Sequence, residues 1–304
     1  MTRVNYCFLI FILITSITAC RVEKPEETSH RPIDIQGHRG ARGLMPENTL
    51  PAFRKALELG ITTLELDLAV TRDQQLLISH EPYMNHYIAL DSLGESVPKE
   101  GEQKHNIYQM SYTQIKKYDV GSKFVKRFPD QQKMVVHKPL LEELVSLVNQ
   151  FESENPNKVI RYNIEIKCLP MGDNVFHPTP EVFSKLVYDF IIQNMNPKHV
   201  NVQSFDFRVL RYFHETYPEI ELAVLIENTE SIDKNLEELG FTPQIYSCYH
   251  PFLDQEKINK LHDMKMKVIP WTVNEEEDMK KLIHWGVDGI ISDYPDRVLN
   301  VIAN

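Results

Sequence analysis

The stretch TLELDLAVTRDQQLLISHE, residues 63–81, decides how this chain folds. Its first part alternates acids with leucines. Because successive side chains of a strand point to opposite faces, Glu65 and Asp67 share one face and the leucines cover the other. Residues 71–75 are too few for a crossover between parallel strands, which needs about a dozen residues. Residues 68–70 and 76–79 are therefore predicted to form an antiparallel hairpin at the carboxyl end of this strand, with His80 at its end.

Short apolar runs of the same kind alternate with helical patterns along the chain from residue 33 onward. The predicted strands are residues 33–36, 64–67, 162–166, 200–203, 221–226, 245–247, 267–272 and 289–291, and the predicted helices are residues 49–59, 140–152, 180–195, 207–217, 254–264 and 275–285. Strands that alternate with helices form parallel sheets, and these strand–helix units predict an α/β fold, a (β/α)8 TIM barrel. A doubly wound open sheet is the alternative, although the sequence lacks the glycine-rich nucleotide motifs that would support it.

One long segment, residues 81 to about 136, interrupts this alternation. It is polar and rich in turn residues, and it is too long for an ordinary connection between a strand and a helix. Because it follows the hairpin after the second strand, it is predicted to lie at the C-terminal mouth of the barrel as a lid or specificity insert. Its charged part, Lys99–Lys104, is expected to be solvated loop.

Composition excludes several classes of protein. The 304 residues are 42% hydrophobic and 25% charged, which is ordinary for a globular protein and argues against disorder or a multi-span membrane protein. With 33 Lys and Arg against 43 Asp and Glu, the net charge is −10, so the chain is not expected to bind nucleic acid, which requires a basic surface.

The N-terminus has the pattern of a bacterial lipoprotein. Residues 7–14, CFLIFILI, are apolar but too few for a span, which needs about 20 residues. Residues 17–20, ITAC, resemble a lipobox. We therefore expect a signal peptide (1–19), a tether (20–32) from a lipidated Cys20, and a domain at 33–304 that is extracytoplasmic and anchored to a bacterial membrane on its periplasmic or cell-surface side. A plain secretory peptide and a short membrane anchor are the alternatives.

Two further cysteines, Cys168 and Cys248, lie within the domain. Outside the cytoplasm a bridge between them is permitted, but nothing in the sequence requires one. They are expected to be free, buried thiols.

Acidic side chains are predicted to meet inside the barrel. Glu65 and Asp67 face the interior near its mouth, and in NIEIK, residues 163–167, Glu165 and Lys167 share the inner face of the next barrel strand. Interior carboxylates resist desolvation unless a cation neutralises them. Three of them form an oxygen-ligand site for one divalent cation, Mg2+ or Ca2+. An internal ion pair with Lys167 is the other interpretation of the same spacing.

Two histidines favour the metal interpretation. His38 follows the first strand and His80 ends the hairpin, so both are expected at the barrel mouth beside the acids, Arg39 and Lys167. Two proton-transfer groups, a cation site and two anion-binding side chains are what displacement at phosphorus requires. One histidine would deprotonate the attacking oxygen, and the other would protonate the departing one.

These motifs together resemble the glycerophosphodiester phosphodiesterase family, within the superfamily of phosphatidylinositol-specific phospholipase C-like barrels. The matching segments, in order, are HRGARGLMPENTLPAF (38–53), LELDLAVTRDQQLLISHE (64–81), NIEIK (163–167), QSFD (203–206), WTVN (271–274) and GVDGIISDYPD (286–296). The chain departs from the family where Glu81, in place of the usual Asp, follows the second histidine.

The resemblance implies hydrolysis of glycerophosphodiesters to sn-glycerol 3-phosphate and an alcohol, with a divalent cation. The implied residues are His38 and His80 for catalysis, Glu65, Asp67 and Glu165 for the metal, Arg39, Lys167 and Trp271 for the substrate, and Glu47 as a brace for the His38–Arg39 loop. Attack by water and passage through a cyclic phosphate both remain open.

Three other functions remain as alternatives. One is a lysophospholipase D acting on lipids, which an exposed apolar lip in the insert would favour. Another is a surface lipoprotein that binds headgroups without catalysis, against which the histidine pair argues. The third is a barrel lyase or aldolase, but Lys167 lies among acids that keep it protonated and so does not suit Schiff-base chemistry.

Overall fold

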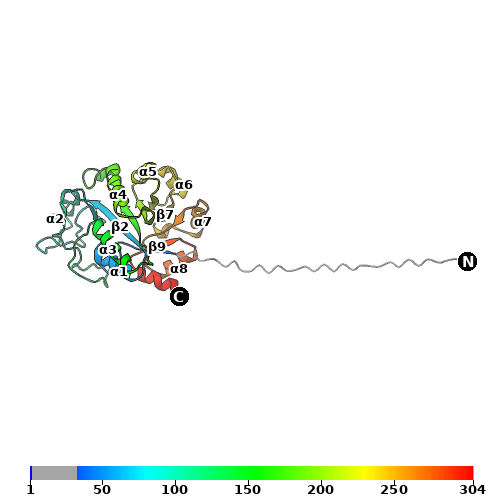
Figure 1. The fold of residues 1–304 in the computed structure, drawn as a ribbon, viewed down its shortest axis with the longest axis horizontal. Coiled ribbons are helices and arrows are strands. Elements are labelled where there is room, and N and C mark those ends of the chain that lie inside the picture. Colours follow the sequence, from blue (N-terminus) through cyan, green and yellow to red (C-terminus); the bar gives the residue numbers. More distant parts are fainter. Residues whose placement is uncertain (2–32, 304) are drawn as a thin grey trace. The chain divides into compact units, whose positions relative to one another are not determined.

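The chain forms a barrel of parallel strands in the computed structural model, which describes residue 1 and residues 33–303 (Figure 1). The strands are paired in the order β8-β7-β6-β5-β4-β2-β1-β9, with β3 added beside β2. Their bounds are β1 Asp34–Gly37, β2 Thr63–Val70, β3 Leu76–Ile78, β4 Arg161–Ile166, β5 Val200–Ser204, β6 Glu221–Ile226, β7 Ile245–Cys248, β8 Lys267–Val268 and β9 Gly289–Ser292.

Backbone hydrogen bonds close the barrel between its two end strands. The amide of Asp288 donates to Val268 O at 2.9 Å, and the amide of Ile291 donates to Pro270 O at 3.0 Å. The prediction of a TIM barrel is thus confirmed, and the doubly wound open sheet is excluded.

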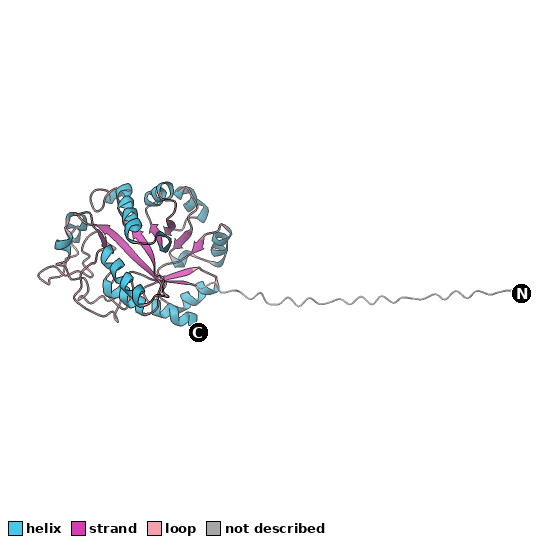
Figure 2. Cartoon of the chain, viewed as in Figure 1, coloured by secondary structure: helices cyan, strands magenta, loops and turns pink. Residues whose placement is uncertain are grey.

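Helices surround the strands (Figure 2). They are α1 Leu50–Glu58, α2 Tyr112–Ile115, α3 Leu141–Glu154, α4 Pro180–Asn194, α5 Phe207–Thr216, α6 Ile232–Leu239, α7 Gln255–Asp263, α8 Glu276–His284 and α9 Pro295–Ala303. The leucines of β2 share one apolar cluster with Phe53 of α1 and Leu141 of α3, all of them buried. The alternation in 63–70 therefore places the leucines against the helices, as predicted.

Two predictions of secondary structure need correction. The strand expected at 267–272 ends after Val268, because Pro270 has no N–H to donate to a ladder. Helices α6 and α9 were not predicted, although α6 has local signals for both of its ends. The hydroxyl of Ser231 accepts from the amide of Lys234 at its start, and Gly240 ends it in the left-handed region at φ 88°.

The hairpin and the insert lie at the end of β2. β3 pairs antiparallel with β2, with Leu68 opposite Ile78 and Val70 opposite Leu76, as predicted. The insert has a small core of its own, in which Met84, Ile107 and Ile115 are fully buried.

The charged run at 99–104 is more structured than expected. Residues Glu102–Lys104 form a 3-10 turn, and the carboxylate of Glu102 accepts a 2.9 Å hydrogen bond from the amide of His86. A second contact joins the same carboxylate to the His86 ring at 2.6 Å. The turn therefore helps to fix the insert.

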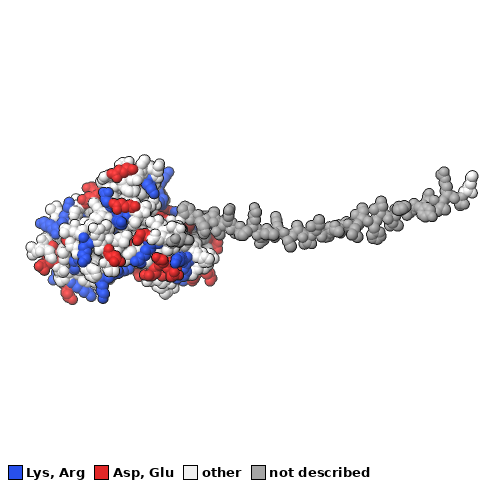
Figure 3. Space-filling view, turned by 90° about the horizontal axis from the view of Figure 1, so that it is seen from below, with Lys and Arg blue, Asp and Glu red and all other residues white. Residues whose placement is uncertain are grey.

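The remaining predictions have mixed outcomes. Cys168 and Cys248 are both buried and free, as expected. Cys20, the signal peptide and the tether lie outside the described residues. Within the described part of the chain, no helix has the length and apolar character needed to cross a membrane. On the face shown in Figure 3, cationic and anionic side chains are interspersed, so this face lacks the basic stripe that nucleic acid requires.

Candidate active site

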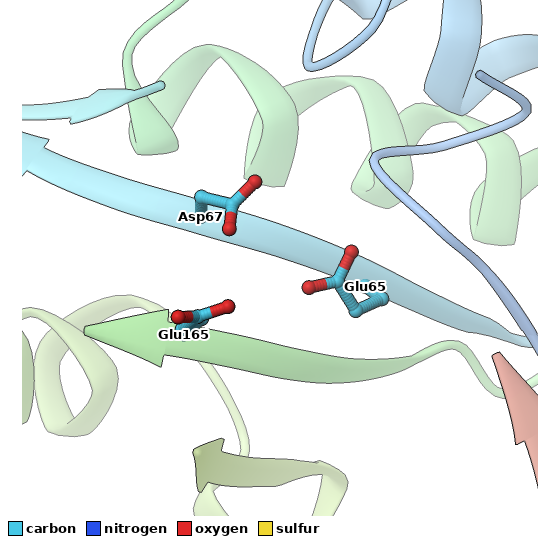
Figure 4. A group of neighbouring side chains, drawn as sticks. All are labelled: Glu65, Asp67 and Glu165. Atoms are coloured by element: carbon cyan, nitrogen blue, oxygen red, sulfur yellow. The ribbon is translucent and has the colours of Figure 1, made fainter. Parts of the chain in front are cut away.

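Three carboxylates converge inside the barrel near its C-terminal mouth. Glu65 and Asp67 project from β2 and Glu165 from β4, and Asp67 lies opposite Glu165 in the strand register (Figure 4). One oxygen from each can be chosen so that all lie within 4.8 Å of one another, and all three side chains are buried. The structure thus brings together the three predicted metal ligands.

Lys167 partly neutralises this cluster. Its Nζ lies 2.8 Å from Glu165 Oε1 and 3.3 Å from Asp67 Oδ1. Burial and the neighbouring carboxylates Asp67 and Glu165 raise the pKa of Glu65 well above its usual range. Although burial alone acts in the opposite direction, Lys167 and other nearby cations hold the pKa of Asp67 well below its usual range. The predicted ion pair is therefore present beside the three converging carboxylates.

The donor set fits a hard divalent cation. All three groups offer oxygen, which Mg2+ and Ca2+ prefer. Asp67 Oδ1 is buried, and its contact among the described residues is the ion pair with Lys167 rather than a hydrogen bond. Side-chain amides orient two of the other oxygens. Gln203 Nε2 donates to Glu65 Oε1 at 3.0 Å, and Asn48 Nδ2 donates to Asp67 Oδ2 at 2.8 Å. Such outer contacts orient the carboxylates toward a metal.

His38 is held by a carboxylate that the sequence analysis did not single out. Its Nδ1 lies 2.6 Å from Asp293 Oδ1, and its Nε2 lies 4.0 Å from Glu65 Oε2. Asp293 follows β9, and the side-chain amide of Asn274 donates to its other oxygen at 2.8 Å. Burial lowers the pKa of His38 to about 4, outweighing the opposite effect of Asp293. Because an ionised Asp293 can only accept, His38 donates from Nδ1 and keeps a free lone pair on Nε2.

His80 has a similar partner next to it in sequence. Its Nδ1 lies 2.8 Å from Glu81 Oε1. Despite burial, the hydrogen bond and the charge of His80 lower the pKa of Glu81. The carboxylate that differs from the family pattern thus still orients the second histidine.

The loop after β1 is braced as predicted. Glu47 accepts hydrogen bonds from Arg39 Nη1 at 2.7 Å and from Arg42 Nε at 2.6 Å. Gly40 has a φ of 85°, and a Cβ there would lie only 2.6 Å from the backbone of Ala52 in α1. Only glycine lets this loop pack so closely against the helix.

These groups open into one pocket of about 330 Å3. Its lining includes both histidines, Arg39, Lys167 and two of the carboxylates, and also the aromatic side chains of Phe205, Tyr249 and Trp271. The Trp271 ring is fixed because its Nε1 donates to Ser247 O at 3.0 Å. The guanidinium of Arg39 is held by two carboxylates. Its Nη1 contacts Glu47, and its Nε lies 3.3 Å from Asp67 Oδ2.

All predicted site residues within the described part of the chain therefore line or brace one pocket. The sequence analysis missed Asp293, Asn274 and Gln203, and also Arg127, which extends from the insert to the pocket. All three lie in motifs already noted, and Gln203 lies in β5 and Asp293 directly after β9, so their position near the mouth was the available signal.

Comparisons with known proteins agree with this geometry. The sequence profile of the "Glycerophosphoryl diester phosphodiesterase family" matches residues 38–297. A glycerophosphodiester phosphodiesterase of Bacillus altitudinis is 30% identical over 274 residues, which cover 88% of this chain and 97% of that protein.

Solved structures show the same fold. A glycerophosphoryl diester phosphodiesterase structure from Silicibacter pomeroyi DSS-3 has a TM-score of 0.79 at 28% identity and covers 89% of this chain and 93% of its own. An Oleispira antarctica phosphodiesterase in complex with sn-glycerol-3-phosphate has a TM-score of 0.70 at 22% identity, with 90% and 97% covered.

Proposed function

The chain belongs to the glycerophosphoryl diester phosphodiesterase family, and we propose that it hydrolyses glycerophosphodiesters to sn-glycerol 3-phosphate and an alcohol with a divalent cation and two histidines. One observation carries this proposal. Two imidazoles, each oriented by a carboxylate, line the same pocket as the carboxylates of a cation site.

Glu65, Asp67 and Glu165 would hold one Mg2+ or Ca2+ ion, since their oxygens already converge. A bound divalent cation supplies positive charge that stabilises the developing charge on phosphoryl oxygens. Lys167, whose Nζ lies 2.8 Å from Glu165 Oε1, adds a positive charge at the same pocket. Arg39 adds a fixed positive charge at the pocket wall.

His38 and His80 perform the proton transfers. In each ring Nδ1 is engaged by a carboxylate, so Nε2 is the atom available to the substrate. One ring accepts the proton of the attacking oxygen, and the other donates a proton to the departing alcohol oxygen. Trp271 lines the pocket, and its ring face would pack against the glycerol carbons of the substrate.

A protein that only binds headgroups is the rival function. Binding a phosphodiester does not require two imidazoles whose Nδ1 atoms are both held by carboxylates. This arrangement matters for proton transfer and therefore favours an enzyme.

The purified protein, offered glycerophosphocholine, glycerophosphoethanolamine and glycerophosphoglycerol, tests the proposal through release of glycerol 3-phosphate. We expect turnover with Mg2+ or Ca2+ that EDTA abolishes and the added ion restores. Asp67→Asn is the matched control and should need a much higher ion concentration. Turnover that EDTA does not affect would refute the cation site, and binding without turnover would support the rival function.

We further propose that Cys20 is lipidated and anchors the domain to a bacterial membrane on its periplasmic or cell-surface side, since Cys20 ends a lipobox-like sequence that follows an apolar run. A Cys20→Ala variant should leave the membrane fraction or remain unprocessed. Unchanged attachment would mean that another anchor exists.

A further inference from the structure

Two further arginines, Arg42 and Arg127, line the catalytic pocket next to the His38–Asp293 contact. Arg42 lies in the loop between β1 and α1, and Arg127 lies in the insert. Arg42 Nη1 is 3.8 Å from Asp293 Oδ1, and Arg127 Nη2 is 3.7 Å from Asp293 Oδ2. The barrel and the insert thus each bring one guanidinium to the same carboxylate. We call these two side chains the arginine pair.

Asp293 leaves hydrogen-bond donors of the arginine pair available. Its Oδ1 lies 2.6 Å from His38 Nδ1, and its Oδ2 accepts from Asn274 at 2.8 Å. Both arginines lie farther from these oxygens than a hydrogen bond allows, so their contacts with Asp293 are ion pairs only. A guanidinium carries five N–H donors in a planar fork, which matches the oxygens of a carboxylate or a phosphate. The arginine pair can therefore offer directed hydrogen bonds to an anionic ligand.

One buried aromatic ring holds both guanidinium groups. The Cζ atoms of Arg42 and Arg127 lie 4.9 Å and 5.3 Å from the centre of the Phe128 ring, where the ring face attracts a cation. Phe128 is 2% exposed, and it meets Tyr294 edge to face with ring centroids 6.2 Å apart. Arg42 is fixed further by its 2.6 Å hydrogen bond to Glu47, whereas the Arg127 side chain is 62% exposed. The pair thus combines one rigid guanidinium with one that an entering ligand can reach.

The arginine pair and the cation site lie at different nitrogens of the His38 ring. Nδ1 contacts Asp293, beside which the arginine pair lies, whereas Nε2 lies 4.0 Å from Glu65 Oε2 of the cation site. In the proposed function the scissile phosphoryl group binds at the cation site, where Arg39 and Lys167 already contact the carboxylates. The arginine pair is therefore placed to meet a different negative group of the same substrate.

A carboxylate across the barrel disfavours binding of a second anion elsewhere in the pocket. Glu227 directly follows β6 and also lines the pocket. In the ring of strands, three strands separate β6 from β1 on either side, so Glu227 follows the strand opposite the one that precedes Arg42. A negative group on the substrate is repelled by Glu227 and attracted by the arginine pair. Both effects direct it to the same side of the pocket.

We propose that the arginine pair binds a second anionic group, a carboxylate or a phosphate, on the alcohol that departs from phosphorus. This inference rests on the proposed function. The glycerol half of a glycerophosphodiester carries only hydroxyl groups, so the second anion belongs to the departing alcohol. Arg42 and Arg127 are then residues that determine specificity, and they favour glycerophosphodiesters of anionic alcohols over those of neutral or cationic ones.

The test measures kcat/KM of the full chain for substrates that differ by one anionic group. Glycerophosphoserine is compared with glycerophosphoethanolamine for a carboxylate, and glycerophosphoglycerol phosphate with glycerophosphoglycerol for a phosphate. In at least one comparison kcat/KM should be about three- to tenfold higher for the more anionic substrate, and the preference should shrink at high salt because screening weakens it. Turnover without a preference in either comparison would overturn this inference alone. Turnover of no substrate would overturn the proposed function as well.

Neighbouring cations of the insert provide the variants. Arg127→Gln should lower the preference for the more anionic substrate about three- to tenfold, and Arg127→Lys should keep part of it, because lysine retains the charge but not the fork. Lys126→Gln is the matched control, since Lys126 is exposed beside Arg127 and does not line the pocket, and it should leave the preference unchanged. An equal loss for both substrates in Arg127→Gln would mean that Arg127 acts on the scissile phosphate or on Asp293. That result, or an equal fall in preference in Lys126→Gln, would overturn the assignment.

Discussion

Both histidines of the pocket are assigned a proton transfer, but the carboxylates that contact their Nδ1 atoms lie in different parts of the structure. His38 is paired with Asp293, which is 255 positions away in sequence, and both are buried. His80 is paired with Glu81, its neighbour in the chain, and this pair is partly exposed. The first pair depends on the pairing of β1 with β9, whereas the second depends on the end of one hairpin.

This difference indicates how strongly the orientation of each ring depends on its carboxylate. Asp293 is fully buried and is itself held by the amide of Asn274, so solvent has little access to the side of the His38 ring that carries Nδ1. Glu81 has one oxygen on His80 and another that is buried without a hydrogen bond. Since the His80 side chain is 30% exposed, water can replace part of what Glu81 provides.

The largest effect should come from removing either ring. His38→Ala and His80→Ala should each lower kcat about 100-fold or more, because each deletes one proton transfer. The double variant should be only slightly worse than either single variant, since the two rings act in one step. Steady-state kinetics on glycerophosphocholine measure this. Near-normal turnover in one single variant would remove that ring from the mechanism.

Replacing the carboxylate in each pair should show that His38 depends on Asp293 more strongly than His80 depends on Glu81. Asp293→Asn should lower kcat about 10- to 100-fold, because the new amide can donate to Nδ1 and so favours the tautomer whose Nε2 carries the proton. Glu81→Gln should cost about tenfold or less, since solvent can still reach His80. Comparing kcat in the two variants, after circular dichroism confirms folding, measures the difference. Equal losses would show that burial of the first pair is not what distinguishes it.

The sequence predicted best what depends on local periodicity. The alternation in 63–70 placed Glu65 and Asp67 inside the barrel, and the short turn at 71–75 predicted the hairpin. The Asp293–His38 contact could not be read in the same way, because it requires the first and last strands of the barrel to be neighbours.

The smallest effect on kcat should come from shortening the Glu81 side chain by one methylene. Glu81→Asp withdraws the carboxylate by about 1.5 Å. The backbone at this point cannot follow freely, because Ser79 Oγ donates to Glu81 O at 2.6 Å and the Ser79 amide donates to Asp67 O at 2.9 Å. The His80 ring must turn or share a water with the new Asp, so kcat should fall about two- to threefold while KM is unchanged. A fall as large as that of Glu81→Gln would mean that His80 depends on a direct bond as strictly as His38 does, and the contrast between the two pairs would then lose its basis.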